Sequence, residues 1–168
     1  DRLDPQPDDR ILGDYTDRGP RSREVIDMLA ARANDEDFIC LKGNHDEWFL
    51  SFLTDPDEGD GFLHWGGIQT LESYGVDLTG SIRSNAELAR ELARLIPPEH
   101  RRFLSHLRLF LEEGDYFFCH AGVRPGVALQ FQDPYDLMWI RGEFHAHKGD
   151  FGKIIVHGHT PQAAVEFH

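Results

Sequence analysis

The chain alternates between short apolar runs and stretches in which apolar residues recur with helical spacing. Four apolar runs predict strands, and each ends in a polar cluster; they are Ile11–Leu12, Phe38–Leu41, Tyr116–Cys119 and Ile154–Val156. Helical spacing predicts helices between them, over about 23–33, after Gly43, over about 85–96, and from Pro98 to about Leu107. This alternation of strands and helices favours a layered α/β or α/β/α sandwich.

Local signals predict several boundaries of these elements. Ser84 with Glu87 forms a capping box for the helix over about 85–96, and Ser22 is a candidate cap for the one over about 23–33. The segment 112–115, between two apolar runs, is typical of a hairpin turn. Residues 54–67 are rich in Asp and Gly, and we expect a loop there.

Length and charge restrict the class of protein. The 168 residues predict a single domain. The 30 acidic residues outnumber the 17 basic ones, and the net charge of −13 argues against nucleic-acid and membrane partners. No apolar run approaches the roughly 18 residues of a membrane span. Cys40 and Cys119 lie in apolar runs, which favours reduced thiols and a cytoplasmic protein.

The polar clusters at the four strand ends contain residues suited to metal-assisted chemistry. They are Gly13–Gly19, Gly43–Asp46, His120–Gly122 and His157–Thr160. Ligands of open α/β sheets bind beyond the carboxyl ends of the strands, so a site is expected there. Carboxylate, amide oxygen and imidazole together suit Mn, Fe, Zn or Co. Two such ions about 3.5–4 Å apart can assist an in-line phosphoryl transfer.

Two further features fit phosphate-ester chemistry. Arg18 offers a fork of N–H donors to phosphate oxygens, and His45 can protonate a leaving group while Asp17 orients its ring. Each cluster alone also has an ordinary structural explanation, such as a Gly-Asp turn, a helix cap at Asn44 or a core histidine at His120. The hypothesis of a site therefore depends on four such clusters in one chain, each at a strand end.

In order and approximate spacing, the four clusters resemble the signatures of the phosphoprotein phosphatases, which are calcineurin-like metallophosphoesterases. The family motifs GDxxDRG, GNHE or GNHD, HAG or HGG, and GH match Gly13–Gly19, Gly43–Asp46, His120–Gly122 and Gly158–Thr160. Three further segments resemble its bacterial branch: Trp65–Gly67 with Gly75–Val76, Asp136–Arg141, and His157–Pro161. The resemblance covers nearly the whole chain. It implies an α/β fold, a layered β-sandwich flanked by helices in the order α/β/β/α.

The resemblance implies a metal centre with two divalent ions. Asp14 would bridge both ions, and Asn44, His120 and His159 would complete the second site. Manganese is the first expectation, with iron, zinc or cobalt as alternatives. A metal-bridging hydroxide would attack phosphorus directly, without a covalent phospho-enzyme.

The resemblance also implies roles for residues around the metals. Asp17 and His45 would form an acid dyad in which His45 protonates the leaving oxygen. Phosphate would be bound by Arg18, Asn44 and Arg141, of which Arg141 lies in the looser motif.

The chain departs from the family pattern at its ends. The family begins with a strand ending in GDxHG, which holds the first metal, and this sequence has no such motif. We expect one metallophosphoesterase domain over 1–168 with a helical cap-like insertion around 54–106, lacking N- and C-terminal parts and the first strand. The alternative is a one-metal or inactive form. We favour missing parts, because every other catalytic position is intact.

The expected activity is hydrolysis of phosphate monoesters, on phosphoserine or phosphothreonine of proteins and further on phosphotyrosine. The partner would be a phosphorylated protein or a small phosphate ester. A symmetrical dinucleoside tetraphosphate hydrolase shares the motifs and is the alternative enzyme. Such an enzyme should have extra basic or aromatic residues lining its groove, and the arginines of the segment 54–106 do not decide between the two. A non-catalytic metal-binding module is the alternative of another class.

The remaining histidines have no assigned chemistry. His157 either lines the site or contacts one of the metal ligands without binding the metal itself. The other six receive a structural interpretation, with His145 and His147 expected in solvent; they are His64, His100, His106, His145, His147 and His168.

Overall fold

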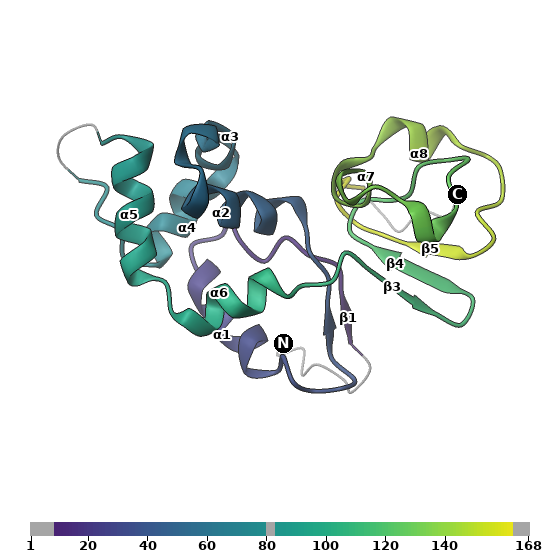
Figure 1. Cartoon of the computed structure of the whole chain (residues 1–168), viewed down its shortest axis with the longest axis horizontal. Coiled ribbons are helices and arrows are strands. Elements are labelled where there is room, and N and C mark those ends of the chain that lie inside the picture. The colour runs from purple at the N-terminus through teal and green to yellow at the C-terminus, as the bar shows by residue number, and fades with distance from the viewer. Residues whose placement is uncertain (1–8, 80–82, 163–168) are drawn as a thin grey trace.

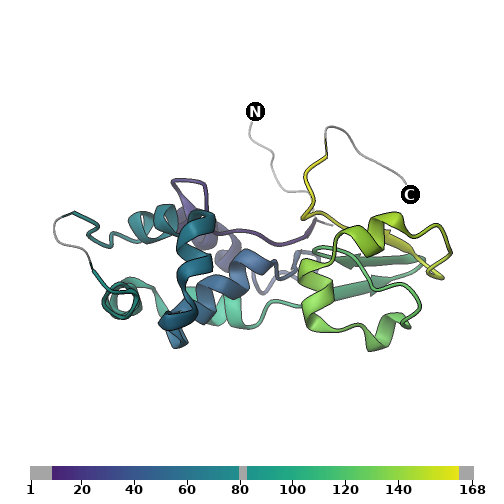
Figure 2. The same cartoon turned by 90° about the horizontal axis from the view of Figure 1, so that it is seen from above.

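Two groups of elements lie side by side in the computed structural model, which describes residues 9–79 and 83–162 (Figures 1 and 2). The first group is mainly helical: β1 (Arg10–Ile11), α1 (Ser22–Ala31), β2 (Ile39–Cys40), α2 (Asn44–Thr54), η1 (Pro56–Glu58), α3 (Asp60–Phe62), η2 (Leu63–Gly67), α4 (Ile68–Ser73), α5 (Asn85–Leu95) and α6 (Pro98–Ser105). The second contains β3 (Phe110–Glu113), β4 (Tyr116–Cys119), η3 (Leu129–Phe131), α7 (Pro134–Trp139), α8 (Gly142–Ala146) and β5 (Ile154–Val156).

Each group has its own small sheet. β1 pairs in parallel with β2, and Leu41 continues this sheet by a single parallel bridge to Arg108. In the second group the strand order is β3-β4-β5, with an antiparallel hairpin between β3 and β4 and a parallel pair between β4 and β5. The predicted α/β class is confirmed. The layered α/β/β/α sandwich and the missing first strand stay predictions.

Each group also has its own apolar core. In the helical group the rings of Phe49 and Tyr74 stack with centroids 5.6 Å apart, and those of Phe52 and Phe62 lie 4.9 Å apart. In the sheet group a second core forms under α7 and α8; it contains Phe117, Cys119, Ala121, Val123, Leu137, Ile140 and Phe144. The polar clusters at the strand ends lie between the two cores, so the site depends on how the groups meet.

Most predicted boundaries are close to the observed ones. Ser84 and Glu87 form the expected capping box, in which the Glu87 carboxylate accepts the Ser84 N–H at 2.9 Å. The predicted cap at Ser22 is wrong: Ser22 is the first residue of α1, and its hydroxyl lies 3.1 Å from Thr70 Oγ1. A long-range partner therefore replaces the local cap.

The loop predicted over 54–67 is also wrong. This segment contains η1, α3 and η2, and it turns helical because it buries apolar side chains: Phe62 is 1% exposed and packs on Phe52. The role of the segment 54–106 as a cap stays a prediction. The expectations about the two ends of the chain, and His168, fall outside the described residues.

Two histidines predicted in solvent are instead half-buried. The His145 ring lies 5.4 Å from that of Phe144, and the His147 ring lies 4.8 Å from that of Phe151. Both rings cover the apolar surface of α8 and the loop that follows it. Within the described residues, no helix has the length and apolar character needed to cross a membrane.

Candidate active site

The loops after β1, β2, β4 and β5 bring the four predicted metal ligands together. His120 Nε2 lies 3.0 Å from Asn44 Oδ1, 3.4 Å from Asp14 Oδ1 and 3.1 Å from His159 Nδ1. Ligand atoms of Asp14, His120 and His159 lie within 4.8 Å of one another. Four segments that are distant in sequence therefore present their polar atoms to one point.

Two glycines allow the first two of these loops to approach. A Cβ atom on Gly43 would lie 2.2 Å from Asp14 Oδ1, and one on Gly13 would lie 2.4 Å from the Gly43 nitrogen. No side chain fits in either place, so both positions require glycine. The close approach lets Asp14 Oδ1 accept the N–H of His45, at the start of α2, at 3.2 Å.

The site concentrates unfavourable backbone conformations. Among the non-glycine residues that the structure describes, positive φ occurs at Asp14 (60°), Asp17 (74°), Arg18 (62°) and His159 (61°). Each costs of order 1–3 kcal/mol and persists only where contacts with the surrounding structure offset that cost. All four belong to the predicted site, so local strain coincides with the candidate chemistry.

Asp46 holds this backbone in place, a role that the sequence interpretation missed. Its Oδ2 atom accepts the N–H groups of Asp14 and Gly43, both at 2.9 Å, and its Oδ1 accepts that of Tyr15 at 3.0 Å. Burial raises the pKa of the Asp46 carboxyl to about 7, against the effect of these N–H bonds. An acid three residues after Gly43, at a helix start, was the available signal.

The cluster of Asp14, Asn44, His120 and His159 fits a divalent cation. His120 Nδ1 lies 2.7 Å from the Leu12 carbonyl and must donate to it, which leaves Nε2 as an acceptor. His120 Nε2 therefore carries no proton, although it faces the acceptor oxygens of Asn44 and Asp14. His159 Nε2 is buried with no hydrogen-bond partner among the described residues. Such convergent acceptors suit a metal ion of mixed N/O preference.

The histidines of this cluster are held neutral. Burial lowers the pKa of His120, and it lowers the pKa of His159 to about 3, with the neighbouring His120 contributing. Neutral imidazole is the form that binds a metal, so neither ligand must lose a proton at neutral pH.

His45, Asp17 and Arg18 form a hydrogen-bonded series beside the cluster of Asp14, His120 and His159. His45 Nε2 lies 2.7 Å from a guanidinium nitrogen of Arg18, and its Nδ1 lies 2.6 Å from Asp17 Oδ2. Because a guanidinium can only donate, Nε2 accepts and Nδ1 donates to Asp17. Burial raises the pKa of Asp17, while the hydrogen bonds from His45 and Thr70 oppose that shift.

Arg141 and His157 differ in their relation to the cluster. Arg141 is exposed and lies 3.4 Å from Oγ1 of Thr160, the residue that follows His159. The His157 ring lies perpendicular to that of Phe144 at 4.7 Å. His157 therefore packs on the second core.

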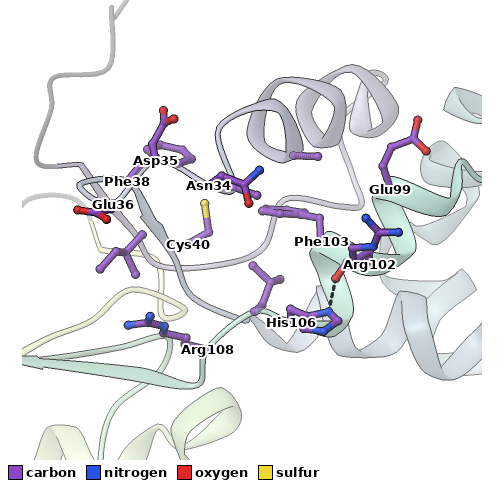
Figure 3. Close-up of a pocket in the computed structure, with 14 residues that line it drawn as sticks. Asn34, Asp35, Glu36, Phe38, Cys40, Glu99, Arg102, Phe103, His106 and Arg108 are labelled. Atoms are coloured by element: carbon purple, nitrogen blue, oxygen red, sulfur yellow. Dashed lines mark hydrogen bonds between the residues drawn. The ribbon is translucent and has the colours of Figure 1, made fainter.

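A separate pocket of about 610 Å³ lies between β2, the end of α1 and α6 (Figure 3). Figure 3 shows Cys40 on the side of β2 and Arg102, on α6, next to His106, and none of the predicted site residues lines the pocket. Burial raises the pKa of the Cys40 thiol to about 11, so the thiolate is scarce at neutral pH. The candidate chemistry lies elsewhere, at the strand ends.

The α/β fold carries at its strand ends a set of donor atoms that fits a divalent metal ion. The family model described as calcineurin-like phosphoesterase matches residues 1–167, so the chain belongs to that family. Its members bind divalent metals and hydrolyse phosphoesters. No curated protein matches the chain.

Proposed function

We propose that this chain is a phosphatase of the bacterial phosphoprotein phosphatase branch, acting on phosphoserine and phosphothreonine of proteins and further on phosphotyrosine. One observation carries the proposal: the buried His45–Asp17 pair lies beside the Asp14, His120 and His159 cluster, and Arg18 donates to the other ring nitrogen of His45. A proton donor, a phosphate-binding cation and a metal cradle in one place suit hydrolysis of a phosphate monoester.

Asp14, Asn44, His120 and His159 would hold a divalent ion, and we propose a second ion that shares Asp14. When bound, such ions polarise phosphoryl oxygens and lower the pKa of water. Manganese is the proposed metal, with iron, zinc or cobalt as alternatives. The neutral imidazoles of His120 and His159 support this assignment.

The residues beside the metals supply binding and protonation. Arg18 donates to His45 Nε2 in the structure, and a phosphate dianion is a stronger acceptor for the same guanidinium. When Arg18 turns to the phosphate, Nε2 can take a proton from solvent water and donate it to the leaving oxygen as the bond between that oxygen and phosphorus breaks. Asp17 would stabilise the charged ring through Nδ1, and we propose Arg141 as a second phosphate contact.

Turnover of a substrate panel tests this function. The purified full-length protein is assayed with Mn²⁺, Fe²⁺, Zn²⁺ and Co²⁺ against phosphoserine, phosphothreonine and phosphotyrosine peptides and diadenosine tetraphosphate. We expect metal-dependent release of phosphate from the peptides. Cleavage of the dinucleotide alone would contradict the phosphatase proposal, and metal binding without any turnover would favour the non-catalytic module.

A series of aromatic rings beside the site supports the dinucleoside tetraphosphate hydrolase as the second candidate. The rings of Trp48 and Trp139 lie 4.6 Å apart, and Trp139 lies 6.1 Å from His159. Tyr135, which is 65% exposed, stacks on Trp139 at 5.9 Å. Exposed planar rings suit a nucleobase as well as a tyrosine side chain.

A further inference from the structure

The hydroxyl group of Thr70, in α4, lies directly behind the His45–Asp17 pair. It accepts the backbone N–H of Asp17 at 2.8 Å and donates to Asp17 Oδ1, also at 2.8 Å. Thr70 is fully buried. The other carboxylate oxygen of Asp17 contacts His45. One side chain therefore holds both the backbone and the carboxylate of the residue that orients the histidine.

The direction of this hydrogen-bond series follows from the number of protons available. A threonine hydroxyl has one proton, and Thr70 donates it to Asp17. Ser22 Oγ, 3.1 Å from Thr70 Oγ1 and also buried, must then be the donor in their contact. Ser22 therefore donates to Thr70, and Thr70 donates to Asp17 Oδ1. The other carboxylate oxygen, Oδ2, accepts a hydrogen bond from His45 Nδ1.

Gly66, at the kink of η2 that precedes α4, holds the backbone of Arg18, the residue after Asp17. Its carbonyl accepts the N–H of Arg18 at 3.1 Å. Gly66 itself has a φ of +113°, and a Cβ atom there would lie 2.6 Å from the Arg18 nitrogen. The successive positive φ angles of Asp17 and Arg18 are thus imposed by contacts from the segment 66–70.

We propose that Thr70 is a positioning residue for proton donation by His45. By fixing Asp17 in its strained conformation, Thr70 keeps Oδ2 against His45 Nδ1 and so directs Nε2 toward the leaving oxygen. This inference rests on the proposed function. It also assigns a role to the segment from Trp65 to Val76, whose motif the catalytic residues leave unexplained.

The test compares Thr70→Val, which keeps the shape but loses the hydroxyl, with Thr70→Ser, which keeps the hydroxyl. Both are assayed on phenyl phosphate, which has a poor leaving group, and on p-nitrophenyl phosphate, which has a good one. General acid catalysis contributes about 10²- to 10⁴-fold, so we expect Thr70→Val to lower kcat for phenyl phosphate by roughly tenfold or more. The loss on p-nitrophenyl phosphate should be several-fold smaller, KM should change little, and Thr70→Ser should restore kcat.

Thr16→Val is the matched control. Thr16 is also buried and adjoins Asp17, but its hydroxyl has no hydrogen-bond partner among the described residues. This variant should leave both rates unchanged. Exchange of the Asp17 amide proton, followed by NMR, gives a readout independent of turnover: protection should be lost in Thr70→Val and kept in Thr70→Ser and Thr16→Val.

The outcomes separate this inference from the proposed function. Equal losses on both esters, or a Thr70→Ser variant as impaired as Thr70→Val, would overturn the positioning role while the phosphatase proposal stands. A wild-type protein that cleaves no phosphate ester with any metal would overturn both. Selective loss on the poor leaving group, with rescue by serine, would support both.

Discussion

His45 Nδ1 lies 2.6 Å from Asp17 Oδ2, and both side chains are buried next to Asp14, whose carboxylate accepts the His45 N–H. Burial leaves the Asp17 carboxylate few partners other than the His45 ring and Thr70. The contact between His45 and Asp17 fixes the ring so that its second nitrogen, Nε2, accepts a hydrogen bond from Arg18. The most direct predictions therefore concern this pair and the acceptors next to it.

Replacing His45 by Asn should abolish most turnover. The asparagine amide can still donate to Asp17, but it supplies no proton to a leaving oxygen, so kcat should fall by about 10²- to 10⁴-fold on substrates with poor leaving groups. Steady-state kinetics with Mn²⁺ measures this. His106→Asn, on an exposed ring outside the cluster, is the control. Full activity of His45→Asn would remove the histidine from the proposed mechanism.

Removal of the metal should lower the thermal stability. A ligand that binds only the folded state stabilises it by about 2.7 kcal/mol at a free concentration of 100 times its Kd. Chelation of Mn²⁺ should therefore lower Tm in the wild type. In Asp14→Asn, which weakens a charged ligand, the difference should shrink, and Asp55→Asn, at an exposed acid, should behave as wild type. An undiminished metal-dependent shift in Asp14→Asn would argue against the site.

Asp46→Asn should destabilise the fold although it preserves size. The carboxylate accepts three backbone N–H groups on two oxygens, and an amide offers only one acceptor oxygen. At least one buried N–H then loses its partner, at a cost of about 1–3 kcal/mol. Urea unfolding measures the change, with Asp37→Asn, at an exposed acid, as the control. An unchanged midpoint would mean that Asp46 does not hold the Asp14 turn.

The metal-free protein should lose stability in acid partly through His159. Burial lowers the pKa of His159 from 6.5 to about 3 in the folded chain, so between these values the unfolded state binds more protons. The free energy of unfolding must then fall as the pH drops through that window. His159→Gln removes this contribution, and circular dichroism in a chelator should show its acid transition at a lower pH. Identical transitions would contradict the burial of a neutral ring.

Local signals explain what could be read in advance. The Ser84–Glu87 capping box and the hairpin between Phe110 and Cys119 involve residues a few positions apart, so their patterns are visible in the sequence. The strand-end clusters were visible for the same reason, because glycines and polar residues follow each apolar run directly. The sequence did not show which atoms of those clusters come into contact.

Most of the elements, the candidate residues and the resemblance to the metallophosphoesterases could be read from the sequence alone. Tertiary structure decided which atoms face one another. Asp46 reaches Asp14 from 32 residues away and Thr70 reaches Asp17 from 53, and Ser22 leaves its expected cap position to bind Thr70. Burial likewise made short helices of 54–67. Spacing encodes hydrogen bonds within one element, but contacts between elements arise only when the packing of two apolar cores brings distant segments together.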